Sequence, residues 1–588
     1  MTKQITFTDY GITLKVEKGS TILEAARQAG IAVESPCNGT GTCGKCKLHA
    51  TQLVPAEAVL IKKSIYSSKG GMEGYVLACQ ACIEEDLSVI LGKKEETNLN
   101  ILSEGRSFVP DVKSEISKQY DAAADHSLVL FHGQYPYAGA DVPGPEESPE
   151  GVPGDKEPEE SPEGVLLARE PGDTREQLYG VTIDIGTTTL VAALIDLSTG
   201  REEASESALN PQAHYGQDVL SRISMASEEK GLRTLYQEVI EEINRLIAVV
   251  AERRKVPTDQ IYEVVFSGNT CMIHLATGVN PESLGRYPYT PVIRGGNLLT
   301  ARSINVKIAP HGLVYLPPII SAYVGPDITS GVLAAQLDTL KGTTLFVDIG
   351  TTGEMVIARD GVLAATSTAA GPAFEGRNID FGMRAADGAI EEMQVGDDGT
   401  VLLKTIGNAP ASGICGSGLL DILGELTAHG VINKNGRFVD PEKTALPEEL
   451  SRRLRKQNGK YVFGLSDTVY LTQKDVRQVQ LAKGAVRSGI EFLMKHLGLA
   501  ADQIDRVYIA GSFGYHLKSS SLLRIRMLPE EFEGKIEYIG NTSKTGGTAF
   551  LLNPEYRRKM EGLVRQIEYI ELADDKDFQK VFVNSLLF

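Results

Sequence analysis

The sequence lacks the features that place a chain in a membrane or in an oxidising compartment. Its 588 residues include no apolar run long enough to span a bilayer, and the first residues, Met1–Phe7, have no signal-peptide core. Seven cysteines, two of them isolated at Cys271 and Cys415, do not make a disulfide framework. We therefore expect a protein of the reducing cytoplasm with no membrane partner.

The chain also lacks an excess of basic residues. It has 59 Lys and Arg against 77 Asp and Glu, which gives a net charge of −18. Proteins that bind nucleic acid neutralise phosphates with Lys and Arg, so this balance argues against nucleic acid as a partner. The length is sufficient for several domains, each with its own core.

Much of the acidity is concentrated between residues 141 and 175. This segment has 11 acidic residues, 3 basic residues and seven prolines, and the heptapeptide Glu-Glu-Ser-Pro-Glu-Gly-Val occurs in it twice, at Glu146–Val152 and Glu159–Val165. Such a composition buries too little apolar surface to offset the chain entropy. We interpret residues 141–177 as a flexible, self-repelling linker, with an interaction tail as the alternative.

Four cysteines near the N-terminus have the spacing of an iron–sulfur site. Gaps of five, two and thirty-two residues separate Cys37, Cys43, Cys46 and Cys79, and glycines lie between the first three. Three close thiolates and one distant thiolate are typical of [2Fe–2S] ferredoxins. Glycine allows backbone N–H groups to approach the sulfurs closely. The spacing therefore predicts a [2Fe–2S] cluster and one-electron transfer.

Zinc is the alternative ligand for these thiolates. Cys43 and Cys46 form one C-x-x-C pair, and Cys79 and Cys82 form a second. Zinc would leave Cys37 without a role, and the separation of the pairs exceeds the usual zinc-ribbon spacing. We predict Cys37, Cys43, Cys46 and Cys79 as the iron ligands, with an exchange of Cys79 for Cys82 left open.

The elements around the cysteines predict a small mixed domain. Short strands are expected at residues 5–7 and 12–16, followed by a helix that Ser20 or Thr21 caps and that extends to residue 29. Further strands are expected at residues 47–50 and 87–91. Over residues 1–95 this order resembles the β-grasp fold of [2Fe–2S] ferredoxins, with the cysteine gap of the adrenodoxin-like group.

From residue 178 the chain contains two similar hairpins. A buried strand ends near Asp184 in a Gly/Thr turn, and the pattern recurs 164 residues later at Asp348. Glycine turns bring N–H groups to phosphate oxygens, threonine hydroxyls add donors, and an aspartate can hold Mg²⁺ through water. A purely structural hairpin is the alternative for a single copy. The turn residues are Gly186, Thr187, Thr188 and Thr189, and Gly350, Thr351, Thr352 and Gly353.

These turns resemble the two phosphate loops of the ATPase superfamily that includes actin, sugar kinases and the seventy-kilodalton heat-shock proteins. Residues 507–514 resemble its adenosine motif, and residues 540–549 resemble the small-residue helix start that follows. The resemblance implies a two-lobed, ribonuclease-H-like fold of mixed sheets and helices, with lobe I at 178–340, lobe II at 341–588, and ATP and Mg²⁺ as ligands. The further nucleotide contacts that it implies are Gly416, Ser417, Gly511, Ser512 and Gly514.

The fusion of a ferredoxin-like domain with this ATPase fold resembles the reductive activators of corrinoid proteins. The similarity extends through residues 475–484 and 568–571. It implies an enzyme that uses ATP to pass one electron from the cluster to an inactive Co(II) corrinoid protein of a methyltransferase system. It also implies an upstream low-potential electron donor. Between about residues 97 and 178 relatives carry a linker and a compact middle domain, whereas this chain has a connecting segment or reduced middle region at 96–140, so a dimerising role of that domain, and with it a homodimer, is left open.

The resemblance assigns roles to three carboxylates. Asp184 and Asp348 position the metal ion, and Glu354 orients the attacking water, with a surface carboxylate as the alternative for Glu354. A small-molecule kinase with a redox-sensing front domain and a nucleotide-gated electron carrier without turnover are the alternative functions. Activators of radical dehydratases hold a [4Fe–4S] cluster between subunits, and Cys271 and Cys415 do not offer the ligand pairs that this needs.

Overall fold

The computed structural model describes residues 2–29, 31, 33, 46–49, 53–54, 59–60, 75–83, 86–90, 108–136, 157–511, 517–572 and 575–588. Four predicted site residues, Cys37, Cys43, Ser512 and Gly514, lie outside the described residues. The chain divides into two compact units. The first holds residues 1–98 with the short segments 211–222 and 457–460, and the second holds the rest.

The N-terminal unit contains the predicted ferredoxin-like elements. Strand β1 (Thr2–Phe7) pairs antiparallel with β2 (Ile12–Glu17) and parallel with β8 (Leu87–Val89). Helix α1 (Ile22–Gln28) begins at a capping box, in which the Thr21 hydroxyl accepts from the Glu24 N–H at 3.1 Å and the Glu24 carboxylate accepts from the Thr21 N–H at 2.7 Å. The other strands are β3 (Lys47–His49), β4 (Leu53–Val54), β5 (Val59–Leu60), β6 (Tyr75–Leu77) and β7 (Cys82–Ile83).

Lobe I contains a six-stranded sheet with the order β15-β14-β13-β16-β18-β17. Its central strand β13 pairs antiparallel with β14 and parallel with β16. The strands are β13 (Tyr179–Ile185), β14 (Thr189–Asp196), β15 (Glu202–Leu209), β16 (Ile261–Gly268), β17 (Asn297–Thr300) and β18 (Leu313–Leu316). The helices of this part of the chain are α3 (Val219–Ala226), α4 (Glu229–Arg254), α5 (Thr270–Ala276) and α6 (Pro326–Ala334).

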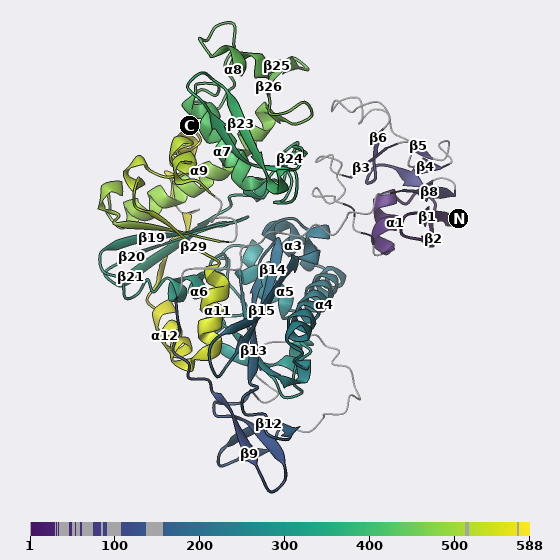
Figure 1. Cartoon of the computed structure of the whole chain (residues 1–588), viewed down its shortest axis with the longest axis vertical. Coiled ribbons are helices and arrows are strands. Elements are labelled where there is room, and N and C mark those ends of the chain that lie inside the picture. Colours follow the sequence, from purple (N-terminus) through teal and green to yellow (C-terminus); the bar gives the residue numbers. More distant parts are fainter. Residues whose placement is uncertain are drawn as a thin grey trace. The chain divides into compact units, whose positions relative to one another are not determined.

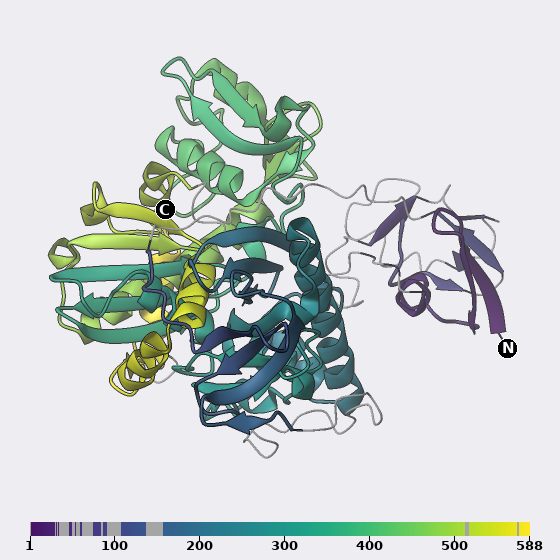
Figure 2. The ribbon, with the colours of Figure 1, turned by 60° about the horizontal axis from the view of Figure 1, so that its bottom comes forward.

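Lobe II repeats this arrangement. Its sheet has the order β29-β28-β19-β20-β21-β30, so strands from the end of the chain lie beside strands from its middle (Figure 2). In both sheets the strand with the predicted aspartate lies between its antiparallel hairpin partner and a later parallel strand. This confirms the duplicated, actin-like fold. The strands are β19 (Thr343–Ile349), β20 (Gly353–Arg359), β21 (Val362–Thr368), β28 (Arg506–Ala510), β29 (Ile536–Gly540) and β30 (Glu568–Tyr569).

Further elements complete lobe II. Two three-stranded sheets, β23-β22-β24 and β25-β26-β27, follow the second hairpin in the chain. Their strands are β22 (Ala389–Val395), β23 (Val401–Thr405), β24 (Gly413–Ile414), β25 (Leu454–Gln457), β26 (Lys460–Gly464) and β27 (Tyr470–Thr472). The helices are α7 (Gly416–Ala428), α8 (Glu448–Arg453), α9 (Gln473–His496), α10 (Ser519–Arg524), α11 (Thr542–Leu552), α12 (Pro554–Val564) and α13 (Phe578–Ser585).

A four-stranded sheet precedes lobe I and corrects the linker prediction. Its order is β11-β12-β10-β9, with β9 (Ile116–Asp121), β10 (His126–Phe131), β11 (Glu160–Ser161) and β12 (Gly164–Pro171). The prediction of a flexible linker is therefore wrong for residues 157–177, and residues 108–136 are folded rather than a plain connecting segment. The prediction from composition failed for two reasons. Val165 and Leu167, two positions apart on one face of β12, are buried in a core that also contains residues of the large sheets, and Lys118 forms an ion pair with Glu170 at 2.5 Å.

Helices α6 and α11 join the two lobes and run side by side (Figure 1). Small residues allow the close approach, because a Cβ on Gly546 would lie 2.0 Å from the carbonyl oxygen of Ser330. Gly562 in α12 offers a matched contrast, since a Cβ there would have nothing within 4 Å.

We expect Gly546→Ala to lower the free energy of unfolding by about 1–3 kcal/mol through overpacking. The same change at Gly562 should stabilise the helix by roughly 0.5–1 kcal/mol, because alanine loses less backbone entropy than glycine. Thermal melts of the two variants should show a lower melting temperature for Gly546→Ala and a higher one for Gly562→Ala. Equal shifts would contradict the close packing of α6 on α11.

Candidate functional site

The first predicted phosphate turn connects β13 and β14. The N–H of Gly186 donates to the carbonyl oxygen of Thr189 at 2.9 Å, and a Cβ on Gly186 would lie 2.6 Å from that oxygen. Glycine is therefore required for the turn to close. Asn269, at the start of α5, donates from Nδ2 to the Thr187 hydroxyl at 2.9 Å. Asn210 Nδ2 donates to the carbonyl oxygen of Gly186, also at 2.9 Å. Neighbouring strands thus hold this turn in place.

The second turn connects β19 and β20 in the same way. The N–H of Gly350 donates to the carbonyl oxygen of Thr352 at 3.0 Å, and Asp348 lies opposite Glu354 in the hairpin register. Gly511, at the start of the predicted adenosine motif, has φ +97°, and a Cβ there would lie 2.7 Å from Asp348 Oδ1. The structure therefore brings the motif after β28 directly against the aspartate of the second turn.

Four acidic side chains of the two lobes influence one another electrostatically. Burial, with a smaller effect of Asp184, raises the pKa of Asp348 to about 7. Burial and then Asp348 raise the pKa of Asp327 to about 8. Burial, then Asp327 and Asp348, raise the pKa of Glu354 well above its ordinary range. Carboxylates that disfavour one another's ionisation are stabilised in the charged form by a cation among them.

Sequence reasoning missed Asp327. It lies in the first turn of α6, after Gly325 at the N-cap and Pro326 at N1, and its Oδ1 accepts from the N–H of Ile328 at 2.9 Å. The available signal was Gly325-Pro-Asp327, which begins nine positions after the end of the apolar run Leu313–Leu316. This motif has no counterpart in the repeat that contains Asp184 and Asp348, so the repeat does not indicate Asp327.

Glu354 lies inside the protein rather than on its surface. The residue is 4% exposed, and the hydroxyl of Thr352 donates to its carboxylate. The alternative interpretation of a surface carboxylate at a hairpin turn is therefore wrong. Its predicted role in orienting water remains a prediction.

The second lobe holds Asp184 directly. Asn541 Nδ2 donates to Asp184 Oδ2, and the Ser543 hydroxyl donates to Oδ1, each at 2.8 Å. Both residues belong to the beginning of α11, where Asn541 is the N-cap. Burial raises the pKa of Asp184, and these two hydrogen bonds oppose the rise. The aspartate of one lobe is thus tied to the helix that joins the lobes.

A glutamate that the sequence analysis did not identify connects the two predicted phosphate turns. Glu375, at the end of the 3-10 turn Pro372–Glu375, accepts from the hydroxyls of Thr188 and Thr351. Arg377 lies beside it, with Nε 3.6 Å from Glu375 Oε2. Thr188 and Thr351 belong to different turns. Because both hydroxyls donate to the same carboxylate, the two turns lie close together and face each other. No repeat or motif in the sequence marks this position.

Gly416 and Ser417 begin helix α7, where Cys415 is the N-cap. Ser417 lines a cavity of 110 Å³ together with Lys518 and acidic residues of β22 and α7. Lys518 Nζ lies 2.7 Å from Glu392 and 3.1 Å from Asp421. The structure therefore places Ser417 near the chain that follows the 511–514 motif.

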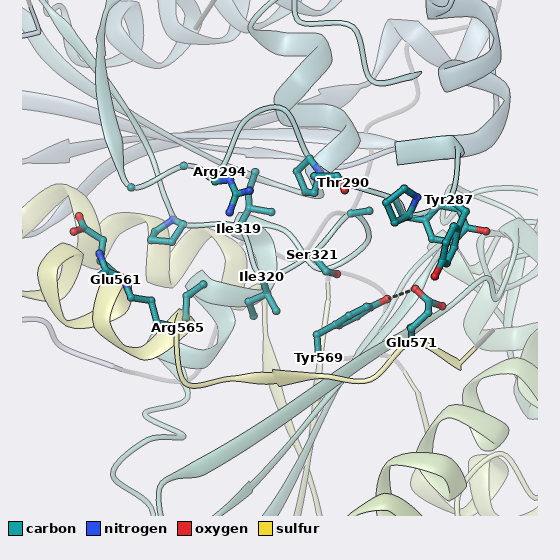
Figure 3. Close-up of a pocket in the computed structure, with 18 residues that line it drawn as sticks. Tyr287, Thr290, Arg294, Ile319, Ile320, Ser321, Glu561, Arg565, Tyr569 and Glu571 are labelled. Carbon is teal, nitrogen blue, oxygen red and sulfur yellow. Dashed lines mark hydrogen bonds between the residues drawn. The ribbon is translucent and has the colours of Figure 1, made fainter. Parts of the chain in front are cut away.

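A larger cavity of 690 Å³ lies among residues of both lobes (Figure 3). Segments 287–296 and 318–322 line it from lobe I, and Tyr569 and Glu571 line it from lobe II. The Tyr569 hydroxyl lies 3.3 Å from Ser367, the strand partner of Glu354. None of the predicted site residues lines this cavity, so its size alone does not locate the nucleotide site.

Two of the four predicted iron ligands are described, and they lie together. The sulfurs of Cys46 and Cys79 are 3.3 Å apart, and both residues are buried. Tetrahedral thiolate ligands at about 2.3 Å from one metal ion are roughly 3.8 Å apart, so this pair fits two ligands of a single iron. Cys82 lies in β7 and is less buried.

Comparisons with known proteins identify the family. Residues 5–84 match the 2Fe-2S iron-sulfur cluster binding domain. Residues 179–340 match the RACo middle region, and residues 342–588 match the C-terminal domain of RACo, the ASKHA domain. The chain belongs to the RACo family. This RACo-family chain therefore combines a [2Fe–2S] domain with an ATPase domain of the predicted superfamily.

Individual relatives cover nearly the whole chain. The chain is 28% identical to the corrinoid activation enzyme RamQ of Eubacterium limosum over 98% of its own length and 97% of that protein. It is 24% identical to the [Co(II) methylated amine-specific corrinoid protein] reductase of Methanosarcina barkeri, over 70% and 77% of the two chains. The solved structure of a reductive activator for a corrinoid, iron-sulfur protein is 27% identical with a TM-score of 0.69, covering 100% of this chain and 98% of that one.

In the described parts of the chain, no helix is both long enough and apolar enough to cross a bilayer.

Proposed function

We propose that this protein uses ATP to reduce a corrinoid protein from Co(II) to Co(I) with one electron from its N-terminal cluster. The full-length similarity to proteins that are named as corrinoid activators carries the proposal, because it includes both the cluster domain and the ATPase domain. The presence of a cluster domain and an ATPase domain would, without this full-length similarity, be equally compatible with a kinase that has a redox-sensing domain. A shared domain order over 98% of the chain favours the activator.

The energetics explain why both domains are needed. A bound [2Fe–2S] cluster supplies a one-electron donor, and plant-type clusters have potentials of about −400 mV. Each ~60 mV of uphill transfer costs roughly 1.4 kcal/mol for one electron. ATP turnover in the second domain can offset several such steps by changing how the lobes close and how the corrinoid protein is held.

The proposed reaction divides the roles among the predicted site residues. Cys46 and Cys79, with Cys37 and Cys43, hold the cluster. The hydroxyls of Thr187, Thr188, Thr351 and Thr352 and the backbone of the two glycine turns bind the phosphates. Glu354 orients the attacking water.

Magnesium fits the acidic side chains of the two lobes. Asp184, Asp327 and Asp348 come from the two lobes and raise one another's pKa or have pKa values raised by burial. Among the described residues, no three acidic, histidine or cysteine side chains converge on one point to form a direct metal cage. Mg²⁺ usually keeps several waters and binds one or two carboxylates plus phosphates, which agrees with an open arrangement.

The partners follow from the reaction. The electron acceptor is a corrinoid protein of a methyltransferase system, and an upstream low-potential donor must reduce the cluster again after each transfer. We also propose a homodimer. Size-exclusion chromatography with light scattering tests this last point.

An anaerobic spectroscopic assay tests the function. The full-length protein is reduced and mixed with a Co(II) corrinoid protein of the same organism, with and without MgATP, while the Co(I) absorption band is followed. We expect Co(I) only with MgATP. ATP consumption that rises with a small-molecule acceptor and not with the corrinoid protein would favour the kinase alternative. Tight nucleotide binding without turnover would favour the gated carrier.

A further inference from the structure

The carboxylate of Glu375 lies where two sets of phosphate donors meet. It accepts hydrogen bonds from Thr188 in the first turn and from Thr351 in the second, the latter at 2.5 Å. Both hydroxyls belong to the turns that the proposed function assigns to the nucleotide phosphates. A carboxylate and a phosphate group present similar anionic oxygens to hydroxyl donors. Each hydroxyl has only one proton to donate, so these two donors cannot serve both anions at the same time.

The neighbouring arginine has unused hydrogen-bonding capacity. Within the described residues, Arg377 Nη2 is buried and has no hydrogen-bond partner, and the closest approach of the side chain to Glu375 is 3.6 Å from Nε to Oε2. Buried polar groups are nearly always satisfied, and a buried guanidinium nitrogen without a partner costs free energy. Arginine is suited to planar, bidentate recognition of phosphate. Arg377 is therefore ion-paired with Glu375 through Nε and still has a buried N–H group at Nη2 that can donate to a further anion.

The backbone that carries Glu375 is anchored. Phe374, the preceding residue, is fully buried in the hydrophobic core of lobe II, and the N–H of Gly371 donates to the carbonyl oxygen of Thr351 at 2.8 Å. The Glu375 side chain itself remains 19% exposed. Rotation of this side chain can release Thr188 and Thr351 while the backbone of the turn stays in place.

We propose that Glu375 is an internal stand-in for a nucleotide phosphate, and that ATP binding exchanges it for the phosphate, which Arg377 then binds. Without nucleotide, Glu375 satisfies the two hydroxyls and holds the turns of the two lobes together. With nucleotide, a phosphate takes over both hydroxyls and the Glu375 carboxylate rotates away because the two anions repel. This inference rests on the proposed function, since it needs a nucleotide at these turns.

Nucleotide affinity of the full chain tests the exchange. Glu375→Gln removes the charge of the competing anion and retains the shape. We expect this variant to bind AMP-PNP and ADP with Mg²⁺ roughly tenfold more tightly than the wild type, because one charge-assisted competitor is lost. AMP lacks the phosphates that reach both turns, so its affinity should change little. Asp397→Asn, an exposed carboxylate in the turn between β22 and β23, is the matched control.

Arg377→Met provides an independent variant. We expect roughly tenfold weaker binding of AMP-PNP, with no change for AMP. Thermal melts without nucleotide check that each variant is folded, and Glu375→Ala replaces Glu375→Gln if the latter is not.

The outcomes separate the two proposals. If wild-type protein binds none of the nucleotides, the proposed function fails and this inference falls with it. If the wild-type protein binds AMP-PNP and the Glu375→Gln variant binds it equally or more weakly, Glu375 does not compete with the nucleotide phosphate. This result would overturn the proposal that Glu375 is a stand-in. A tighter variant together with a weaker Arg377→Met supports the exchange.

Discussion

Alanine in place of Asp348 is expected to reduce ATP hydrolysis by at least about 100-fold, the scale of losing one preorganised electrostatic contact in a catalytic site. Asp348 is the aspartate of the second predicted phosphate turn, and Gly511 approaches it so closely that a Cβ on this glycine would lie 2.7 Å from the Asp348 carboxylate. Steady-state phosphate release measures the loss. The visible spectrum of the cluster should be unchanged, because the iron ligands belong to a different unit of the chain.

Asp467→Ala is the matched control for this experiment. Asp467 is an exposed aspartate in the turn between β26 and β27, and the substitution should leave hydrolysis and the spectrum at wild-type levels. Full ATPase activity in Asp348→Ala would remove this aspartate from the site. Loss of both hydrolysis and the cluster would indicate a general folding defect rather than a local role.

Serine in place of Cys79 is expected to abolish assembly of a stable cluster, whereas the same change at Cys82 is expected to preserve it. Cys79 has its sulfur 3.3 Å from that of Cys46, and both residues are buried. Cys82, three residues later, belongs to β7. Thiolate is the usual ligand of [2Fe–2S] clusters, and a serine hydroxyl is a much harder donor that is protonated at neutral pH.

Iron and sulfide content per chain, together with the visible spectrum, measures the result. Two irons in wild type and in Cys82→Ser, with loss in Cys79→Ser, would establish Cys79 as the fourth ligand. The reverse outcome would mean that Cys82 is the fourth ligand. Zinc in the purified protein and no inorganic sulfide would return the site to the zinc alternative.

The local patterns of the sequence were sufficient for the hairpins and for the first domain. Asp184 and Asp348 each follow a buried β-strand and precede a Gly/Thr turn, and the turn geometry depends on glycine at the position itself, as the 2.6 Å approach at Gly186 shows. Such features involve residues that are neighbours in the chain. The repetition of the pattern then predicted the duplicated fold, because each copy needs a similar sheet around it.

The composition of residues 157–177 was misleading because their folding depends on contacts with residues that are distant in the sequence. An acidic and proline-rich sequence predicts a solvated chain only when no other part of the protein supplies basic or apolar residues for it to pack against. Here Glu170 is paired with Lys118 and accepts from the hydroxyl of Tyr262, which is distant in the sequence. Val165 and Leu167 belong to a hydrophobic core that also contains residues of both lobes. Burial of a short strand depends on surfaces that its own sequence does not contain.

The sequence by itself determined the [2Fe–2S] domain, the two glycine turns and the two-lobed architecture, because these depend on cysteine spacing, on glycine in tight turns and on a repeated strand–turn–strand pattern. The tertiary structure alone decided that Asp327 joins the acidic side chains and that Glu375 connects Thr188 with Thr351. It also placed Asn541 and Ser543 on Asp184. These contacts join residues up to 359 positions apart, and only the folding of the lobes around α6 and α11 brings them within hydrogen-bond distance.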